Sequence, residues 1–322
     1  MTSWYSYTPA DTVFCKGAEP MEMGMDHTAN SIFPPPVETI SGALRAEVLR
    51  QNSVSIKEYK NKECDKGIIS SIGECGSPAP FKVFGPLFRK DGRFLVPAPY
   101  SWFAEKDLLK KRRTVPVYKG FLMEHSLVST DMDSVLWVKG EGSELSSLGG
   151  FWVDKDYLSS GAEKMDVWKP EDLFDFEERT GIGLDFSSEN NCRSTRYRTV
   201  RTGHLYTFYH SRLKPDVELI FGVDTELPLQ NEGCLNLGGE KRFGKYCLLS
   251  PSPQFKESGE GYFQTLSLIP YSEESASKLV ATGKPVRLGG WDMNRSFHKP
   301  MRNYMPAGTV FTEKIDINLV AI

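Results

Sequence analysis

The chain of 322 residues lacks several features that would assign it to a compartment or a redox class. None of its cysteines forms a C-x-x-C pair, which argues against a zinc knuckle and against a thioredoxin-like site. Its first residues, MTSWYSYTPADTVFCKG, do not have the charged-then-apolar layout of a signal peptide, and no apolar run approaches the roughly 20 residues that span a bilayer. We therefore expect a soluble, cytoplasmic protein with no membrane partner. Its thiols should be reduced and widely separated, at Cys15, Cys64, Cys75, Cys192, Cys234 and Cys247.

Familiar catalytic motifs are missing as well. The sequence contains no P-loop, no G-x-S-x-G elbow and no H-E-x-x-H helix, and Gly181-Ile182-Gly183 is a lone G-x-G. The five histidines are scattered. These absences predict a protein that is not an enzyme, with no cofactor and no metal. One alternative stays open, a metal-independent endoribonuclease that uses His27 as general acid or base.

Short strand-like pieces dominate what is present. Twenty prolines and 28 glycines divide the chain, and segments such as HLYTFYH and DVELIFGV are rich in β-branched and aromatic residues. Helical spacing is clearest over Glu38–Arg50, with weaker signals at Asp154–Ser160 and Ser272–Thr282. This mixture predicts an α+β fold with antiparallel sheets.

Composition also suggests where the chain divides. We predict two domains, 1–150 and 151–322, with the boundary in the Gly/Ser-rich stretch Gly140–Gly150. The stretches near 52–80 and 106–135 are expected to be insertions or long loops. The cations of Lys106–Lys119 would suit RNA, an acidic partner or plain solvent.

A net charge of −3 means that nucleic-acid binding would need clustered basic residues. The first candidate cluster follows the prolines Pro34 to Pro36, which set the angle of the next helix. Ser41 and Arg45 share one flank of that helix, and Gly42 would let a phosphate approach. The alternative is that Gly42 serves helix–sheet packing and that Arg45 is an ordinary surface cation.

The second candidate is the stretch CLNLGGEKRFGKY. Gly238 and Gly239 would expose backbone N–H groups, beside the cations Lys241 and Arg242, in a turn suited to a phosphate. A hairpin turn with solubilising charge is the competing interpretation.

The third candidate runs from Arg287 to Phe311. Cations including Lys299 and Arg302 alternate with Trp291, Phe297 and Tyr304. Aromatic side chains beside cations are typical of single-stranded RNA sites, where bases stack and phosphates are neutralised. The alternative places Trp291 and Tyr304 in the core.

The fourth candidate is a run of arginines before a strand. No acid lies between Glu189 and Asp216, whereas Arg196 and Arg198 belong to a series of basic residues there. This pattern predicts a basic hairpin arm that contacts RNA, or otherwise an acidic neighbouring subunit.

The order of these features resembles the RAMP superfamily of CRISPR-associated proteins, and within it the third Cmr subunit of type III-B effector complexes. The pieces that carry the resemblance cover most of the chain: FPPPVETISGALR, PFKVFGPLFRKDGRFLVPAP, RTGIGLDF, LNLGGEKRFG and KPMRNYMPAGTVF. Residues 52–77 have no counterpart in the pattern.

The resemblance implies two ferredoxin-like (RRM-like) domains with long inserted loops. It implies a non-catalytic subunit that binds the 5′ tag of CRISPR RNA beside the backbone RAMP subunit and docks onto the large polymerase/cyclase-like subunit. By position it assigns RNA contacts to Ser41, Gly42 and Arg45, and to a glycine-rich element at Gly289, Gly290 and Gly308. A purely structural adaptor with no RNA affinity remains the other alternative.

Overall fold

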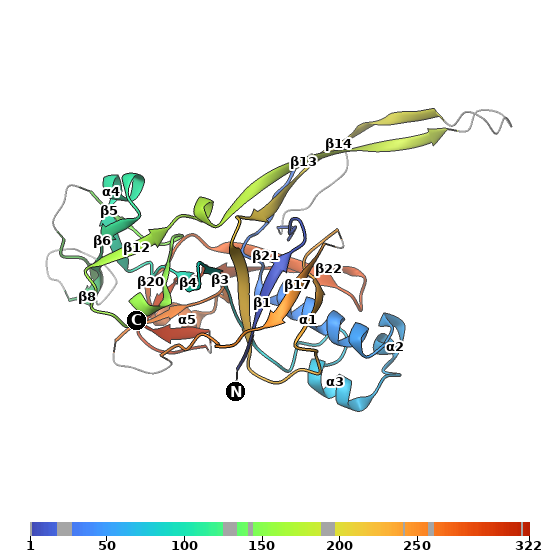
Figure 1. Cartoon of the computed structure of the whole chain (residues 1–322), viewed down its shortest axis with the longest axis horizontal. Helices are drawn as coiled ribbons and strands as arrows, with labels where there is room; N and C mark the ends of the chain where they lie inside the picture. Colours follow the sequence, from blue (N-terminus) through green and yellow to red (C-terminus); the bar gives the residue numbers. More distant parts are fainter. Residues whose placement is uncertain are drawn as a thin grey trace.

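The computed structural model describes residues 2–17, 28–124, 134–140, 144–187, 197–240, 242–256, 261–316 and 318–322. For residues 185–187 and 197–203 only the backbone is considered. These parts form an α+β structure in which antiparallel sheets predominate and helices are few, as predicted (Figure 1).

A nine-stranded antiparallel sheet is the centre of the molecule. Its order is β16-β17-β1-β15-β3-β4-β11-β12-β6. The strands are β1 (Ser3–Pro9), β3 (Val83–Lys90), β4 (Arg93–Pro97), β6 (Thr114–Pro116), β11 (Trp152–Asp154), β12 (Lys164–Trp168), β15 (Val217–Val223), β16 (Glu232–Asn236) and β17 (Phe243–Leu248). Because strands from before and after residue 150 pair in this one sheet, the sheet does not divide where the composition suggested a domain boundary.

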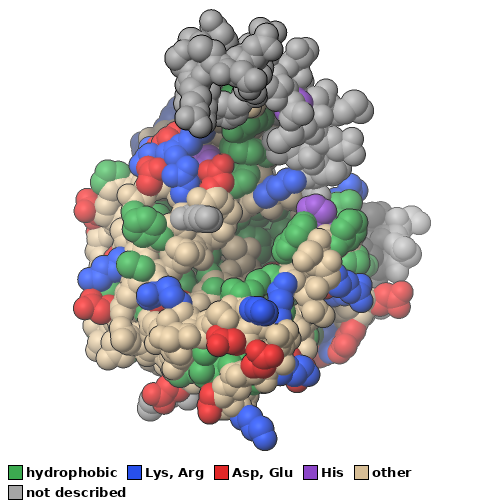
Figure 2. All heavy atoms as spheres, turned by 90° about the vertical axis from the view of Figure 1, so that its right-hand side faces the viewer, with side chains coloured by type: hydrophobic (Ala, Val, Ile, Leu, Met, Phe, Trp, Pro, Cys, Tyr) green, Lys and Arg blue, Asp and Glu red, His purple; other side chains and the backbone are tan. Residues whose placement is uncertain are grey.

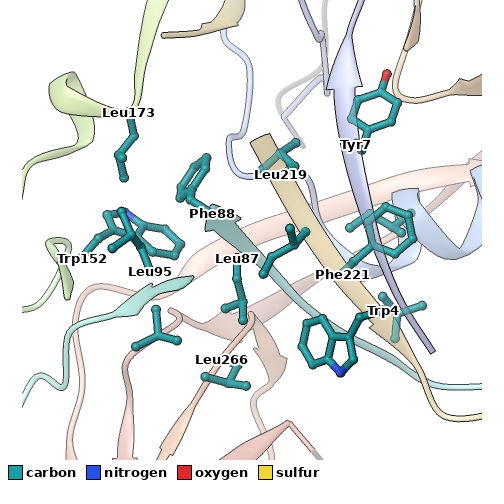
Figure 3. Packing of buried hydrophobic residues seen from close by; sticks show 14 of the residues in the cluster. Trp4, Tyr7, Leu87, Phe88, Leu95, Trp152, Leu173, Leu219, Phe221 and Leu266 are labelled. Atoms are coloured by element: carbon teal, nitrogen blue, oxygen red, sulfur yellow. The ribbon is translucent and has the colours of Figure 1, made fainter. Parts of the chain in front are cut away.

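The core lies on both faces of this sheet, because consecutive residues of β1, β3 and β15 are buried. Large side chains from neighbouring strands pack together there, among them Trp4, Leu87 and Phe221 (Figure 3). Pieces of the sequence that are rich in β-branched and aromatic residues, such as DVELIFGV in β15, supply part of this core, which is why they were recognisable as strands.

Helix α1 (Val37–Gln51) covers part of the core and confirms the predicted helix. Its buried positions include Ile40, Leu44 and Val48, which recur at helical spacing. It packs against β3 and β16. The proline run ends at Pro36, the residue that precedes the first turn.

The stretch 52–80 contains two short helices rather than one long loop, and its character as an insertion stays a prediction. It contains α2 (Ile56–Asn61) and α3 (Lys66–Ile72). Ser55 and Glu58 form a capping box at the start of α2, and the Asp65 carboxylate caps α3 by accepting from the Gly67 N–H. These helices are short and mostly exposed, so they offered no apolar periodicity to detect.

The stretch 106–135 is likewise structured where it is described. It holds α4 (Lys106–Lys111), β6, β7 (Tyr118–Lys119) and β8 (Phe121–Met123), beside β5 (Trp102–Glu105), β9 (Val135–Trp137) and β10 (Leu145–Ser147). Several of its cations are paired: Lys106 with Glu144 at 2.8 Å, and Arg113 with Asp172 at 3.6 Å. The Lys119 amine lies 4.6 Å from the centre of the Trp102 ring, and burial lowers the pKa of that amine.

Two other predicted helices were too long. Asp154–Ser160 contains only the 3-10 turn η1 (Lys155–Tyr157), and a second 3-10 turn, η2 (Pro170–Asp172), follows β12. In Ser272–Thr282 the helix α5 (Glu273–Ser277) gives way to strand β20 (Leu279–Ala281). The pairing of β20 with a neighbouring strand outweighs its weak helical pattern.

A long antiparallel hairpin projects from the body (Figure 1). We call it the arm; it consists of β13 (Phe174–Ser187) and β14 (Tyr197–Leu213). The short strand β2 (Thr28–Ala29) pairs with β14 near the body. The predicted basic hairpin therefore exists as an element.

The C-terminal part adds two small sheets. One has the order β20-β23-β18-β24 and contains β18 (Phe263–Thr265), β23 (Val310–Phe311) and β24 (Leu319–Ala321). The other has the order β19-β22-β21 and contains β19 (Ile269–Pro270), β21 (Val286–Asp292) and β22 (Phe297–Met305). Among the described residues, none of the helices is both long and apolar enough to cross a bilayer.

Candidate nucleic-acid interface

The hairpin formed by β21 and β22 carries most of the third sequence cluster on an exposed surface. Residues 297–303 of β22 are all exposed. Over residues 286–305 the charge is +3 with histidine neutral, since Asp292 is the only acid. Asp292 accepts from the backbone N–H groups of Asn294 and Arg295, and it lies 3.9 Å from the Arg295 guanidinium.

The other three cations of this hairpin, Arg287, Lys299 and Arg302, form no ion pair with an acid among the described residues, although the charge of Lys299 helps to lower the pKa of Asp292. Unpaired, exposed cations are the groups that neutralise phosphates and release counterions on binding. This part of the hairpin therefore has the electrostatic character expected of a polyanion site.

The aromatic residues of the hairpin are arranged differently from what was expected. Trp291 and Phe297 are exposed, at 54% and 67% of their surface, and the Trp291 and His298 rings are perpendicular, with their centres 5.2 Å apart. Tyr304 is only 7% exposed. Trp291 and Phe297 thus offer free ring surface for stacking, whereas burial of Tyr304 argues against the stacking role proposed for it.

Tyr304 instead joins the hairpin to helix α1. Its hydroxyl donates to Glu38 Oε1 at 2.9 Å. Burial, reinforced by the Glu38 charge, raises the pKa of Tyr304 to about 12, so the hydroxyl stays protonated and remains a donor. This contact sets the distance between the base of the hairpin and the first turn of the helix.

The exposed side of α1 next to this contact is open. Gly42 follows Glu38 by four residues and so lies on the same side of the helix. It is exposed, and a Cβ at Gly42 would meet no atom within 4 Å, which rules out the helix–sheet packing alternative within the described structure. Ser41 is half-buried. The open position at Gly42 is consistent with a close approach by a ligand backbone.

Arg45 serves the protein's own structure. Its guanidinium donates to the carbonyls of Ser77, at 2.9 Å, and Glu74, and to the Tyr59 hydroxyl. These contacts fasten the inserted helices to α1. The geometry therefore favours a structural role for Arg45 over phosphate neutralisation.

The loop that Arg45 holds also reaches the hairpin. A Cβ at Gly76 would lie 3.2 Å from the Asn294 Cβ, so the loop and the hairpin tip are in close contact. The hairpin therefore contacts helix α1 at its base, through Tyr304 and Glu38, and the loop at its tip, through Asn294 and Gly76. Figure 2 shows that this side of the molecule is hollowed beneath the arm, with hydrophobic side chains visible in the hollow.

The turn at Gly238 and Gly239 packs against the segment that contains Phe14. Gly238 has φ +84°, and a Cβ there would lie 2.3 Å from the Phe14 carbonyl oxygen, which accepts from the Gly239 N–H at 2.6 Å. Arg242 contacts Asp11 at 3.3 Å and Glu240 at 3.1 Å. Lys241 lies outside the described residues. The placement of these residues favours an internal junction over a phosphate-binding turn.

The remaining glycines divide into two kinds. Gly308 has φ +89° and a Cβ there would lie 2.4 Å from the Ala98 carbonyl oxygen, so it permits a close approach between the C-terminal part and the end of β4. Gly289 and Gly290 lie in the exposed hairpin at a bulge between Leu288 and Gly290. A Cβ at Gly290 would meet only the Lys299 side chain, at 3.4 Å.

Other candidate residues fall where the structure says less. Arg196 and His27 lie outside the described residues, and for Arg198 the backbone pairing with Phe186 in the arm is known. In the described part of the chain, no group of three or more His, Cys, Asp or Glu side chains gathers to hold a metal ion.

An apolar cavity of about 230 Å³, which the sequence did not indicate, lies between the root of the arm and the base of the hairpin. Prolines and aromatic rings line most of it, including Pro34, Pro170, Phe174 and Pro306. Ser267 also lines it, and its buried hydroxyl has no hydrogen-bond partner in the described structure. The proline run was noticed only as the start of a helix, because the other prolines are distant in sequence.

The fold is similar to that of chains in solved Cmr structures. One is in the cryo-EM structure of the Type III-B Cmr-beta bound to cognate target RNA and AMPPnP, state 1, with a TM-score of 0.56 and 16% identity. Another is in the Type III-B Cmr-beta bound to cognate target RNA, with a TM-score of 0.56 and 18% identity. Each match covers 97% of this chain and 86% of the other. The fold of this chain is therefore that of these chains from the Type III-B Cmr structures.

A family model identifies the family of this chain. The model for the CRISPR-associated protein Cas_Cmr3 matches residues 5–258. The chain belongs to the Cas_Cmr3 family of CRISPR-associated proteins, which confirms the resemblance found in the sequence. No curated protein matches the chain.

Proposed function

We propose that this chain is a non-catalytic subunit of a type III-B Cmr effector complex that binds the 5′ tag of CRISPR RNA. In that complex it would dock onto the large polymerase/cyclase-like subunit, beside the backbone RAMP subunit. Membership of the Cas_Cmr3 family supports this assignment.

The observation that carries the RNA-binding part is the exposed hairpin of β21 and β22. It presents unpaired cations together with free ring surface on Trp291 and Phe297. Unpaired nucleotides are bound by this combination, because bases stack on the rings while cations neutralise the backbone. The open position at Gly42 on α1 lies one helical turn from the contact between helix and hairpin.

Docking onto a protein partner is supported by a different surface. On the hairpin of β8 and β9, Phe121 and Trp137 are cross-strand neighbours and both are exposed, at 41% and 52%. Exposed aromatic residues of this kind are enriched where proteins associate.

We also propose that β1, α1, β3, β15 and β17 form one ferredoxin-like unit. These strands are adjacent in the order β17-β1-β15-β3, all antiparallel, and α1 connects β1 to β3. Strand β16 lies in the connection from β15 to β17. The lobe of residues 91–173 and the arm would then be insertions between β3 and β15 of this unit.

The deciding experiment is direct binding of labelled CRISPR RNA, with and without its 5′ tag, at two salt concentrations. The subunit is measured alone and together with its large partner. We expect tag-dependent binding that weakens with salt. Arg302→Ala should reduce the slope of affinity against salt by about one unit, because one phosphate contact is lost.

Lys164→Ala is the matched control, since Lys164 is an exposed cation on β12, which lies next to the edge strand β6 of the main sheet and outside the hairpin. It should leave both affinity and slope unchanged. Equal and negligible binding of both RNAs in every sample would contradict the proposal and favour a structural adaptor. Cleavage of the RNA in EDTA would instead favour the endoribonuclease alternative.

A further inference from the structure

Three arginines from two separate regions converge on one carboxylate at the root of the arm. The Asp11 carboxylate contacts Arg179 at 2.8 Å, Arg212 at 2.7 Å and Arg242 at 3.3 Å. Arg179 is on β13, Arg212 is on β14, and Arg242 follows the turn at Gly238. One side chain thus touches both strands of the arm and the turn that leads into β17 of the main sheet.

Two further carboxylates complete the cluster. Glu177 contacts Arg179 at 2.7 Å and Arg212 at 2.6 Å, and Glu240 contacts Arg242. The three arginines are balanced by three carboxylates, so the cluster has no net charge to offer to a phosphate. Its arginines bind the protein's own acids. Hydrogen bonds from Arg179 and Arg212 lower the pKa of both Asp11 and Glu177.

Backbone contacts run through the same place. Val13 and Ser211 exchange two hydrogen bonds of 2.8 Å, which attach the segment after Asp11 to β14. On its other side this segment meets the turn at Gly238 through Phe14. The Phe14 ring also contacts the Phe208 ring, at 5.1 Å. The segment after Asp11 therefore lies between the arm and the body.

Beyond this point the arm projects from the molecule (Figure 1), and Figure 2 shows basic and acidic side chains interleaved below it. A small rotation at the root moves the far end of a long hairpin by a large distance. Single exposed ion pairs contribute little, but a carboxylate shared by three guanidinium groups is a network with restricted geometry.

We propose that Asp11 is a positioning residue that holds the arm at a fixed angle to the main sheet. Its effect on RNA binding rests on the proposed function, whereas its effect on the arm does not. Loss of the Asp11 carboxylate would free the arm to change its angle without removing a contact to RNA.

The test is amide hydrogen exchange of the full chain in Asp11→Asn and in the wild type. In the variant we expect amides of residues 174–182 and 205–213 to exchange on the order of tenfold faster, while those of β1, β3 and β15 keep their rates. Asp175→Asn is the matched control, because it removes one exposed pair, with Lys214, on β13, the strand that carries Arg179. It should change exchange by less than about twofold.

Arg212→Gln gives an independent second variant, which loses contacts to Asp11 and Glu177 and should show the same regional effect. Asp11→Glu retains the charge and should restore most of the protection. Unchanged exchange in the arm of both Asp11→Asn and Arg212→Gln would overturn the proposal, as would equal acceleration in the arm and the main sheet.

RNA binding supplies a readout that a general loss of stability would not reproduce. In Asp11→Asn the affinity for tagged CRISPR RNA should fall while its dependence on salt keeps the same slope, because no phosphate contact has been removed. A reduced slope would overturn the positioning role. If the wild type binds no RNA, the proposed function fails, and hydrogen exchange still decides the role of Asp11.

Discussion

The root of the arm and the hairpin of β21 and β22 are both rich in arginine and lysine, yet they use these residues differently. At the root, Arg179, Arg212 and Arg242 are paired with carboxylates. On the hairpin, Lys299 and Arg302 are exposed and form no ion pair with an acid in the described structure. The first region is held together by its charges, and the second has charge available for a ligand.

The difference shows that a run of basic residues in a sequence does not tell which of their cations are unpaired in the folded protein. The arginine-rich stretch before Asp216 contains no acid, but Asp11 and Glu177 reach its Arg212 from distant positions in the chain. The hairpin has only Asp292, and the backbone of its own turn occupies one oxygen of that carboxylate. Only folding decides which cations are neutralised.

The largest expected effect concerns glycines in the two regions. Gly238→Ala should destabilise the protein by roughly 3 kcal/mol, because a Cβ would both strain the positive φ and collide with the Phe14 carbonyl oxygen. Gly290→Ala should change stability by less than about 0.5 kcal/mol, since only the flexible Lys299 side chain is near. Chemical denaturation of both variants measures these values, and similar losses in the two would break the comparison.

A smaller effect is expected from the aromatic residues of the hairpin. Trp291→Ala should weaken binding of tagged CRISPR RNA by about 1–3 kcal/mol, the cost of losing one stacked base, with little change in the free energy of unfolding. Tyr304→Phe should have the opposite profile. It removes the hydrogen bond to Glu38, so it should lower stability by about 1 kcal/mol, while RNA affinity changes less than in Trp291→Ala.

Binding isotherms and denaturation curves of both variants decide this point. Equal RNA affinity of Trp291→Ala and the wild type would contradict the stacking role of the exposed ring.

The smallest effect is the pH dependence of the arm root. The pKa values of Asp11 and Glu177 are lowered in the folded state, mainly by hydrogen bonds from Arg179 and Arg212. Their contribution is therefore fully present above the unfolded values of about 3.9 for Asp and about 4.3 for Glu, and it is lost as pH falls through the lower folded values.

The difference in thermal midpoint between the wild type and Asp11→Asn should accordingly be constant above about pH 5 and shrink below about pH 4. A midpoint difference that stays the same down to pH 2 would show that the Asp11 charge contributes nothing.

Local pattern was sufficient for part of the fold. Helix α1 was predicted because its apolar residues recur with the period of a helix, and strands such as β15 because they are rich in β-branched and aromatic residues. Helices α2 and α3 were missed, since they depend on caps at Ser55 and Asp65 and on fastening by Arg45 rather than on an apolar face.

The candidate site was predicted only in outline. The hairpin cluster was found from its composition, but the exposure of Trp291 and the burial of Tyr304 follow from the contact of the hairpin with α1. The glycines show the same limit. Gly42 and Gly290 face open space or a flexible side chain, whereas Gly238 and Gly308 meet carbonyl oxygens of remote segments.

The sequence by itself determined the antiparallel α+β character, the helix after the proline run, the basic hairpins and the family to which the chain belongs. These properties depend on the periodicity, composition and order of neighbouring residues. Tertiary structure alone decided which cations are free, which rings are exposed and how the arm is held. Each of these depends on partners such as Asp11, Glu38 and Phe14, brought into contact across long stretches of chain by the packing of the main sheet.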